Sequence, residues 1–270
     1  MGRYKCIFSD VDGTLISSSY HILPKTKRII KKISGMGIPF VPVSARMPCT
    51  MQPLLDEIGI ETPMICYSGA LTLDENGDAV RSVEIPAQAA SEIYHYVNEN
   101  YTTENCSVYR YTDWVADTLD DPLIEKECGI VQMQPVVRDI DGYLREIGGV
   151  HKLFCMGTLE ETDVLAASLP ALRGDILPCK SKVNYIEITA AGVSKSAAIR
   201  EFCREQGIAV EETLAIGDHH NDIDMLELAG LGVVMGNAPE EVRVAGDFVT
   251  ASNDEEGIYL ALRELLEIDI

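Results

Sequence analysis

The sequence predicts an α/β protein built on a parallel β-sheet with helices on both faces. Short apolar runs, for example residues 38–43 and 214–217, have the length and composition of buried strands. Segments with apolar residues at helical spacing, such as residues 24–33 and 194–206, alternate with these runs. Because parallel strands need crossover connections between them, this alternation favours a parallel sheet covered on both sides.

Each element of the first part of the chain has its own local signal. The run at residues 6–8 predicts a strand that ends just before Asp10, and Pro24 suits the first position of a helix over residues 24–33. Residues 38–43 predict a second strand, although two prolines are unusual inside a sheet. The other elements predicted here are a helix over residues 51–58, a strand over residues 64–67 and a hairpin turn at Asn76-Gly77.

The middle of the chain differs in composition, and we expect it to form a separate α/β unit inserted into the first domain. The only tryptophan, Trp114, and seven of the eleven tyrosines lie between Tyr94 and Tyr185. The elements predicted in this part are helices over residues 87–98, 121–128 and 160–169 and strands over residues 107–111, 152–156 and 184–188.

After this insertion the alternation of strands and helices returns. Residues 194–206 predict an amphipathic helix that Gly207 ends, and residues 214–217, 231–235 and 248–249 predict strands. The expected organisation is therefore a core domain of residues 1–85 and 186–270 and an inserted domain of residues 86–185.

The charge balance excludes several classes of function. The chain has 43 acidic and 22 basic residues and a net charge of −21 at pH 7, and residues 201–270 alone hold 17 acids against three bases. A nucleic-acid binder needs a basic surface, and an anionic membrane surface repels an acidic protein. We therefore expect neither partner, and predict a soluble monomer or weak homo-oligomer.

We expect a cytoplasmic location. Only three apolar residues separate Lys5 from Ser9, too few for the core of a signal peptide, and no window approaches the ~20 apolar residues of a membrane helix. The eight cysteines are scattered and none forms a CxxC pair. We interpret them as reduced thiols, and expect neither a zinc site nor a disulfide framework.

Polar residues directly follow three predicted strands, at Asp10, Ser44 and Asp218. In open parallel sheets ligands bind outside the carboxyl ends of the strands, so these side chains are expected to converge. Asp10 and Asp12 lie two apart in an extended segment and so face the same way. Two carboxyl groups so close must share a cation or a proton, and Mg²⁺ suits such a pair because it takes one or two carboxylates together with water and phosphate oxygens.

Lys195 is a further candidate because of its place in a helix. It follows Ser194, the expected N-cap, and so lies in the first turn. A cation there opposes the helix dipole, which is understandable if the helix end and Lys195 both face an anion. An isolated surface lysine is the simpler interpretation when this residue is taken alone.

Residues 217–226 place several metal-capable side chains after a strand, among them Asn221 and Asp222. His219 and His220 are adjacent in this segment, and neighbouring residues rarely reach the same ion. We interpret the two histidines as loop residues beside the site, and their role is left open.

Taken together, four motifs resemble those of the haloacid dehalogenase superfamily, in the same order. They are DVDGTL at residues 10–15, Ser44 in VSAR at residues 43–46, Lys195 at the start of a helix, and GDHHNDIDM at residues 217–225. An insertion of about a hundred residues between the second and third motifs resembles the Cof-like phosphatases, which carry the large α/β (type IIB) cap. The resemblance implies a Rossmann-like parallel-sheet core with an inserted α/β cap domain.

The same resemblance implies an enzyme, a magnesium-dependent phosphatase of small phosphorylated metabolites, with sugar phosphates as the favoured class. Asp10 would be the nucleophile that forms an aspartyl-phosphate, and Asp12 the general acid and base. Asp10, the backbone carbonyl of Asp12 and Asp218 would hold Mg²⁺, and Asp222 would support Lys195 or the metal shell. The residues implied to bind phosphate oxygens are Ser44, Arg46, Lys195 and Asn221.

The chain also departs from the family pattern, and other functions stay open. Residues 44–46 read Ser-Ala-Arg where Thr-Gly-Arg is commoner, and residues 68–70 read Ser-Gly-Ala where Asn-Gly-Ala is commoner. The alternatives are a phosphomutase on the same fold, which would interconvert phosphate isomers, and a non-catalytic phosphate-binding regulatory protein. Asp218-His219-His220 also spells the signature of the DHH phosphoesterases, but their other metal-binding motifs are not found in the sequence.

Overall fold

The computed structural model of the chain describes residues 3–101, 105–131 and 133–268. It comprises two compact units, one of Met1–Arg46, Met51–Val80 and Ser194–Ile270, and a second of Met47–Thr50 and Arg81–Val193. The boundaries expected from the sequence, 86 and 185, fall inside the second unit. Strand β13 (Tyr185–Ala190) explains the later boundary, because it pairs with β12 (Ile176–Lys182) as far as Ala190.

The first unit contains a five-stranded sheet in which every pairing of the described residues is parallel. The predicted parallel sheet is therefore confirmed. The position of β2 also explains its prolines: it lies at one end of this sheet, where Pro42 interrupts less pairing than it would in the middle. The strands in spatial order are β16 (Phe248–Val249), β15 (Leu231–Val234), β14 (Thr213–Gly217), β1 (Cys6–Ser9) and β2 (Phe40–Pro42).

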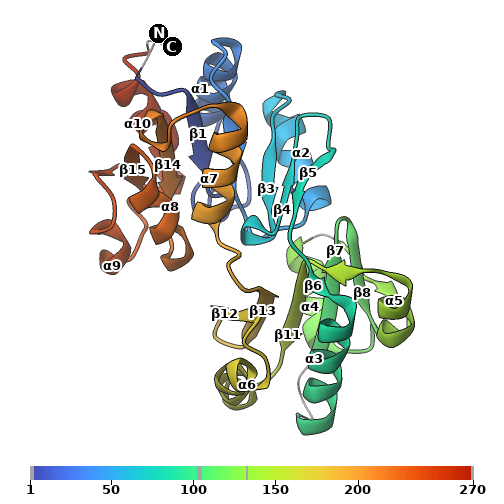
Figure 1. Cartoon of the computed structure of the whole chain (residues 1–270). Coiled ribbons are helices and arrows are strands. Elements are labelled where there is room, and N and C mark those ends of the chain that lie inside the picture. Colours follow the sequence, from blue (N-terminus) through green and yellow to red (C-terminus); the bar gives the residue numbers. More distant parts are fainter. Residues whose placement is uncertain (1–2, 102–104, 132, 269–270) are drawn as a thin grey trace. The chain divides into compact units, whose positions relative to one another are not determined.

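Helices pack against this sheet in two pairs, α1 with α10 and α7 with α8 (Figure 1). Under α7 and α8, the core contains Phe8 of β1, which meets Phe202 of α7 edge to face with ring centroids 5.7 Å apart. On α1, Ile29, Ile30 and Ile33 are fully buried, as the helical spacing predicts. The helices of this part are α1 (Pro24–Gly35), α2 (Pro48–Ile58), α7 (Lys195–Gln206), α8 (Ile223–Leu228), α9 (Glu240–Arg243) and α10 (Gly257–Leu265).

A three-stranded sheet of β3 (Met64–Cys66), β4 (Leu71–Leu73) and β5 (Ala79–Ser82) follows α2 along the chain. The predicted turn lies between β4 and β5. There Asp74 Oδ1 accepts hydrogen bonds from the backbone N–H groups of Asn76 and Asp78, both at 2.9 Å, and Gly77 has φ +84°. Local side-chain bonds of this kind close a turn without help from the rest of the fold.

The second unit is built on a six-stranded, largely antiparallel sheet. Trp114 is fully buried and stacks on Tyr109 with centroids 5.5 Å apart, which supports a packing role for the aromatic residues gathered here. The remaining strands are β6 (Ile85–Pro86), β7 (Asn105–Arg110), β8 (Asp113–Ala116), β9 (Val136–Val137), β10 (Gly149–Val150) and β11 (Lys152–Met156). The helices are α3 (Ala87–Asn100), α4 (Pro122–Val131), α5 (Ile140–Glu146) and α6 (Leu159–Leu172).

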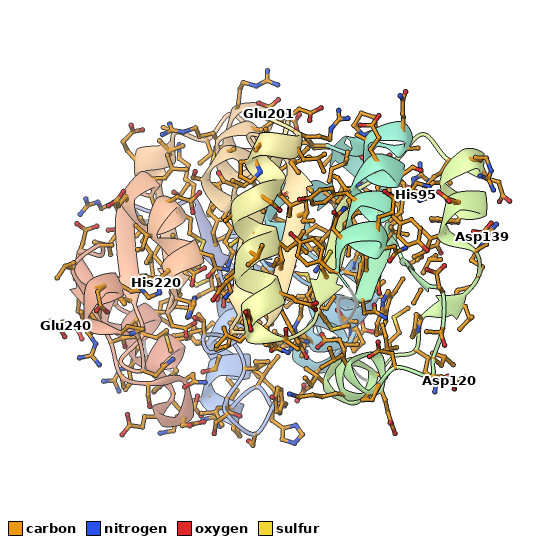
Figure 2. All side chains as sticks on the ribbon, turned by 90° about the horizontal axis from the view of Figure 1, so that it is seen from below. His95, Asp120, Asp139, Glu201, His220 and Glu240 are labelled. Carbon is orange, nitrogen blue, oxygen red and sulfur yellow. The ribbon has the colours of Figure 1, made fainter. Side chains whose placement is uncertain are left out.

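Acidic side chains are exposed at the surface, as the acidic composition predicts. Glu240, in the acidic last quarter, projects into solvent with 80% of its side chain exposed (Figure 2). All eight cysteines are free thiols. Within the described ranges, every helix is too short or too polar to cross a bilayer.

Candidate active site

Three adjacent parallel strands bring the first three candidate residues together. Asp10 follows β1, Ser44 follows β2 after one residue, and Asp218 follows β14, and all three side chains are buried. The backbone N–H of Asp10 donates to Ile216 O at 2.9 Å, which continues the ladder one residue past β1. The carboxyl ends of parallel strands lie at the same edge of a sheet. The sheet therefore brings these three side chains together, as expected from the sequence.

Lys195 reaches this edge from the N-terminus of α7. Ser194 is the N-cap, because its Oγ accepts the backbone N–H of Ala197 at 3.1 Å. The Lys195 ammonium is buried and donates to Asp10 Oδ1 and to Asp222 Oδ1, each at 2.5 Å. Burial disfavours its charged form, but the two carboxylates outweigh this and raise the pKa of Lys195.

Asp222 fixes the conformation of the loop after β14. Its Oδ2 accepts the backbone N–H groups of Asp218 at 3.0 Å and His219 at 2.9 Å, while its Oδ1 accepts Lys195. Asp224 similarly accepts the N–H of Ser196 at 3.0 Å, in the first turn of α7. One short segment thus positions a buried carboxylate, a lysine and a helix end relative to each other.

Asp218 is held by two residues that the sequence analysis did not single out. Thr14 Oγ1 donates to Asp218 Oδ1 at 2.7 Å, and Asn237 Nδ2 donates to Asp218 Oδ2 at 3.2 Å and to Gly13 O at 2.9 Å. Gly13 has φ +83°, and a Cβ built there would lie 2.3 Å from Asp218 Oδ2. Thr14 stands inside the DVDGTL motif, which could have pointed to it, whereas nothing in the local sequence marks Asn237.

The carboxylates of Asp10, Asp218 and Asp222 form a compact group, with one oxygen of each within 4.8 Å of the others. If all three ionise, the single ammonium of Lys195 leaves two negative charges uncompensated. Burial and the charge of Asp222 accordingly raise the pKa of Asp10 well above its ordinary value, and burial raises the pKa of Asp218 to about 6. A buried, crowded, all-oxygen donor set with this charge fits a divalent metal ion.

Asp12 contributes no carboxylate to that group. Its side chain is about half exposed and pairs with Arg46, whose Nε and Nη2 donate to Asp12 Oδ2 at 2.8 Å and Oδ1 at 2.6 Å. Burial lowers the pKa of Arg46, but the hydrogen bonds and charge of Asp12 raise it further. Arg46, which the resemblance assigned to phosphate, is therefore held beside the residue assigned as general acid and base.

The remaining candidates line the loops around the carboxylate group. Ser44 Oγ accepts the backbone N–H of Arg46 at 3.2 Å, which leaves its own hydroxyl hydrogen available for a ligand. Asn221 is exposed in the short 3₁₀ turn His220–Asp222. His219 and His220 are exposed too, and their rings meet edge to face with centroids 5.2 Å apart.

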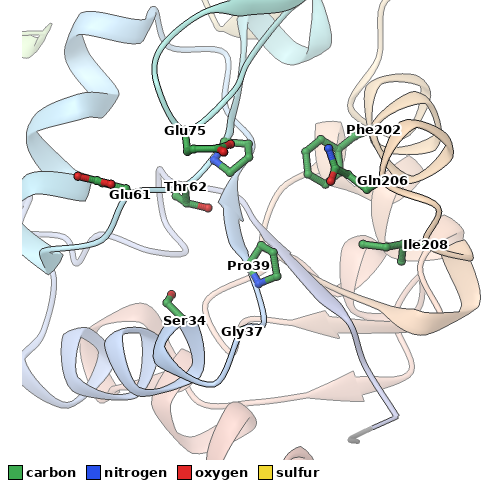
Figure 3. Close-up of a pocket in the computed structure, with 10 residues that line it drawn as sticks. Ser34, Gly37, Pro39, Glu61, Thr62, Glu75, Phe202, Gln206 and Ile208 are labelled. Carbon is green, nitrogen blue, oxygen red and sulfur yellow. The ribbon is translucent and has the colours of Figure 1, made fainter.

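A separate pocket of about 380 Å³ lies at the opposite edge of the parallel sheet (Figure 3). Its lining includes Pro39, just before β2, and Ile208, in the connection from α7 to β14, so it is placed at the amino ends of the strands. None of the candidate residues lines it. The chemistry is therefore to be sought at the carboxyl edge, where the charged side chains gather.

Known proteins are similar to this chain over nearly its whole length. The family model of haloacid dehalogenase-like hydrolases matches residues 7–262. A Haemophilus influenzae protein named "Putative phosphatase" is 33% identical over 97% of this chain and 98% of its own. The pyridoxal phosphate phosphatase YbhA of Escherichia coli is 24% identical over 94% of this chain and 96% of its own.

Solved structures agree over nearly the whole chain. A haloacid dehalogenase-like hydrolase from Bacteroides thetaiotaomicron superposes with a TM-score of 0.89 at 27% identity, covering 97% of this chain and 99% of its own. A subclass IIB sugar phosphatase of the superfamily superposes with a TM-score of 0.82 at 25% identity, covering 98% and 100%. The chain is an enzyme of the haloacid dehalogenase-like hydrolase family, in the branch whose relatives are phosphatases. The resemblance inferred from the four motifs is confirmed.

Proposed function

We propose that the chain is a magnesium-dependent phosphatase of small phosphorylated metabolites, working through an aspartyl-phosphate on Asp10. The observation that carries the proposal is the Asp10 carboxylate, held by Lys195 at 2.5 Å within a buried acidic group at the carboxyl edge of a parallel sheet. Phosphoryl transfer needs mainly positioning and neutralisation of phosphate oxygens, and this arrangement offers both.

In the first step, one carboxylate oxygen of Asp10 attacks phosphorus as the ester P–O bond breaks. Lys195 holds Oδ1 of Asp10, and among the described residues no donor occupies Oδ2, so Oδ2 is the attacking oxygen. The leaving alkoxide takes a proton from Asp12, which must be protonated at that stage. Ser44 and Asn221 would donate to the phosphate oxygens, and the ammonium of Lys195 would add positive charge beside them.

In the second step, water attacks phosphorus and the bond from phosphorus to Asp10 breaks, which releases inorganic phosphate and restores the carboxylate. Asp12, ionised by its first proton transfer, accepts the proton of this water. The Arg46 fork orients the same carboxylate. One exposed carboxyl group thus serves both steps, because its proton leaves in the first and returns in the second.

We further propose Mg²⁺ as the metal, held by Asp10, Asp218 and the backbone carbonyl of Asp12, with Asp222 supporting Lys195 behind them. The metal would supply the positive charge that the acidic site lacks and would neutralise phosphate oxygens during transfer. Thr14 and Asn237 fix both oxygens of Asp218, so that this ligand is oriented before any ion binds.

As substrate class we propose sugar phosphates. Support comes from the structural likeness to a sugar phosphatase of the same subclass. The relative named for pyridoxal phosphate shows that the family also accepts other small phosphorylated molecules. Phosphate release should therefore be screened over sugar phosphates and other phosphorylated metabolites, with Mg²⁺ and with EDTA. Release that survives both EDTA and the Asp10→Asn substitution would contradict the proposal.

A further inference from the structure

The turn Tyr67–Gly69 joins β3 to β4 in the first unit and has an unusual backbone. Three consecutive residues have positive φ: Tyr67 at +51°, Ser68 at +54° and Gly69 at +107°. Positive φ is uncommon for residues other than glycine, and for a bulky residue it is an outlier. Such a conformation persists only where the surrounding structure holds it. Ser68 is also the position at which asparagine is commoner in the family.

Backbone hydrogen bonds join this turn to the loop that carries Ser44. The N–H of Ser68 donates to Ser44 O at 2.9 Å, and the N–H of Tyr67 donates to Arg46 O at 3.1 Å. The N–H of Ser44 in turn donates to Ile65 O, in β3, at 2.9 Å. The main chain of Ser44 is therefore bonded on both sides, through its N–H to β3 and through its carbonyl to the turn.

Gly69 lies against the first turn of α7, the helix that begins with Lys195. A Cβ built on Gly69 would lie 2.3 Å from Ser194 O and 3.1 Å from Ala198 Cβ. The nearer atom belongs to the main chain of the N-cap, so the helix itself would have to move to make room. The missing side chain at Gly69 thus allows α7 to approach as closely as it does, with Lys195 bonded to Asp10.

The connection between β3 and β4 does not by itself require this conformation. The next turn of the same sheet, between β4 and β5, reverses the chain with a single positive φ, at Gly77. Tyr67 is fully buried, and its burial helps to offset the cost of its unfavourable backbone. The fold keeps a costly turn where a simpler one would join the strands, and the contacts with the Ser44 loop and with α7 supply a reason.

We propose that the turn Tyr67–Gly69 is a positioning element of the phosphate site, which sets the separation between Ser44 and Lys195. It contacts the main chain beside both groups, at the carbonyls of Ser44 and Ser194. The proposed metal ligands follow other strands, β1 and β14, so the turn should affect phosphate binding and not metal binding. This inference rests on the proposed phosphatase function and adds to it the segment that aligns two of its phosphate-binding groups.

The Gly69→Ala variant tests the proposal, because its Cβ would push α7 away from the turn. We expect its affinity for inorganic phosphate, measured by calorimetry with Mg²⁺ present, to fall about tenfold or more. The kcat/KM for p-nitrophenyl phosphate should fall by a similar factor. Its affinity for Mg²⁺ alone, measured by calorimetry without phosphate, should not fall. A general loss of structure would lower both affinities, so the difference between them isolates the positioning role.

Gly77→Ala is the matched control. Gly77 has φ +84° and connects strands of the same sheet, but nothing lies within 4 Å of its Cβ position. The variant introduces backbone strain without a clash against α7. It should bind phosphate as tightly as the wild type, although it should unfold at a lower temperature.

Ser68 provides a second test that does not depend on the folding of Gly69→Ala. Its side chain is half-buried and leaves room for replacement. Asparagine tolerates positive φ and a β-branched valine does not. Ser68→Asn should therefore unfold at a higher temperature than the wild type and keep its phosphate affinity. Ser68→Val should lower both the unfolding temperature and the phosphate affinity, again without loss of Mg²⁺ affinity.

Wild-type phosphate affinity in Gly69→Ala or Ser68→Val would overturn the role of the turn and leave the phosphatase proposal standing. Equal losses of phosphate and Mg²⁺ affinity would overturn it too, because the turn would then support the whole site and not the phosphate groups. Failure of the wild-type protein to bind phosphate or hydrolyse any phosphate ester with Mg²⁺ would overturn the phosphatase proposal and this inference with it.

Discussion

Arg46 grips the carboxylate of Asp12 with a two-pronged fork, Nε at 2.8 Å from Oδ2 and Nη2 at 2.6 Å from Oδ1. The planar guanidinium fixes the direction of the Asp12 carboxylate, which a lysine ammonium could not do. We expect Arg46→Ala to lower kcat/KM by about tenfold or more, and Arg46→Lys to recover only part of the loss. Steady-state phosphate release with a good substrate measures both, and wild-type rates in Arg46→Ala would show that the fork has no part in catalysis.

Among the residues that the structure describes, Lys195 is the only buried cation of the site, and it lies between Asp10 and Asp222. Lys195→Met should reduce kcat by about a hundredfold or more, because the ammonium that holds Asp10 Oδ1 and would neutralise phosphate oxygens is lost. It should also destabilise the metal-free fold by about 3 kcal/mol, because two buried carboxylates lose their partner. Urea unfolding without metal, and phosphate release with Mg²⁺, measure the two effects separately.

Lys152 provides a matched control for this substitution. It too is a buried lysine paired with a carboxylate, Glu187 at 3.1 Å, but it belongs to the second unit. Lys152→Met should lower stability without the large fall in kcat. A comparable loss of kcat in both variants would mean that Lys195 acts through stability alone.

Gly13 approaches Asp218 so closely that even a methyl group has no room. A Cβ there would lie 2.3 Å from Asp218 Oδ2, which is a proposed metal ligand. Gly13→Ala should therefore displace this carboxylate, weaken Mg²⁺ binding and abolish most activity. Titration of Mg²⁺ against phosphate release gives the change in apparent affinity.

The Gly37→Ala variant distinguishes the effect of the steric clash at Gly13 from that of backbone strain. Gly37 has φ +82°, close to the +83° of Gly13, but nothing lies within 4 Å of the Cβ position. Both variants should lose about 1 kcal/mol of stability from strain, and only Gly13→Ala should lose activity. Unchanged Mg²⁺ dependence in Gly13→Ala would contradict the place given to Asp218 in the site.

The buried Asp218 predicts a pH dependence of stability in the metal-free protein. Burial raises its pKa from 3.8 to about 6, so the folded state keeps a proton that the unfolded state releases near pH 4. This contribution to the free energy of unfolding is complete below pH 4 and is lost as the pH rises through 6, by about 1–3 kcal/mol.

The Asp218→Asn variant carries no such proton and isolates the effect. Between pH 4 and 7, with EDTA present, the stability of wild type should fall relative to Asp218→Asn. Saturating Mg²⁺ should reverse the trend, because a metal ion prefers the ionised carboxylate. A stability difference that stays constant with pH would show that Asp218 is ionised throughout this range without a cation.

The sequence alone predicts those residues of the site whose place is set by the main chain. Asp10, Ser44 and Asp218 could be found because each follows a buried strand, and parallel strands share a carboxyl edge. Lys195 could be found because its N-cap, Ser194, has a local signal that the structure confirms. These inferences need only periodicity and capping, which a sequence carries in its neighbouring residues.

Contacts between side chains from distant segments could not be found in the same way. The bond from Asn237 to Asp218 and the fork from Arg46 to Asp12 depend on loop conformations that tertiary packing decides. The same limit applies to short elements such as β8 and α5, which the sequence analysis did not identify. Their few residues carry too little periodicity to distinguish them from loops.

The proposed mechanism depends on a covalent bond between Asp10 and phosphorus. The most direct test is to quench the enzyme with acid during turnover of a good substrate in Mg²⁺ and to map the phosphoryl group by mass spectrometry. We expect one phosphoryl group on the peptide that contains Asp10, and none in Asp10→Asn or with EDTA. Wild-type phosphate release by Asp10→Asn, or a phosphoryl group on a different residue, would contradict the claim.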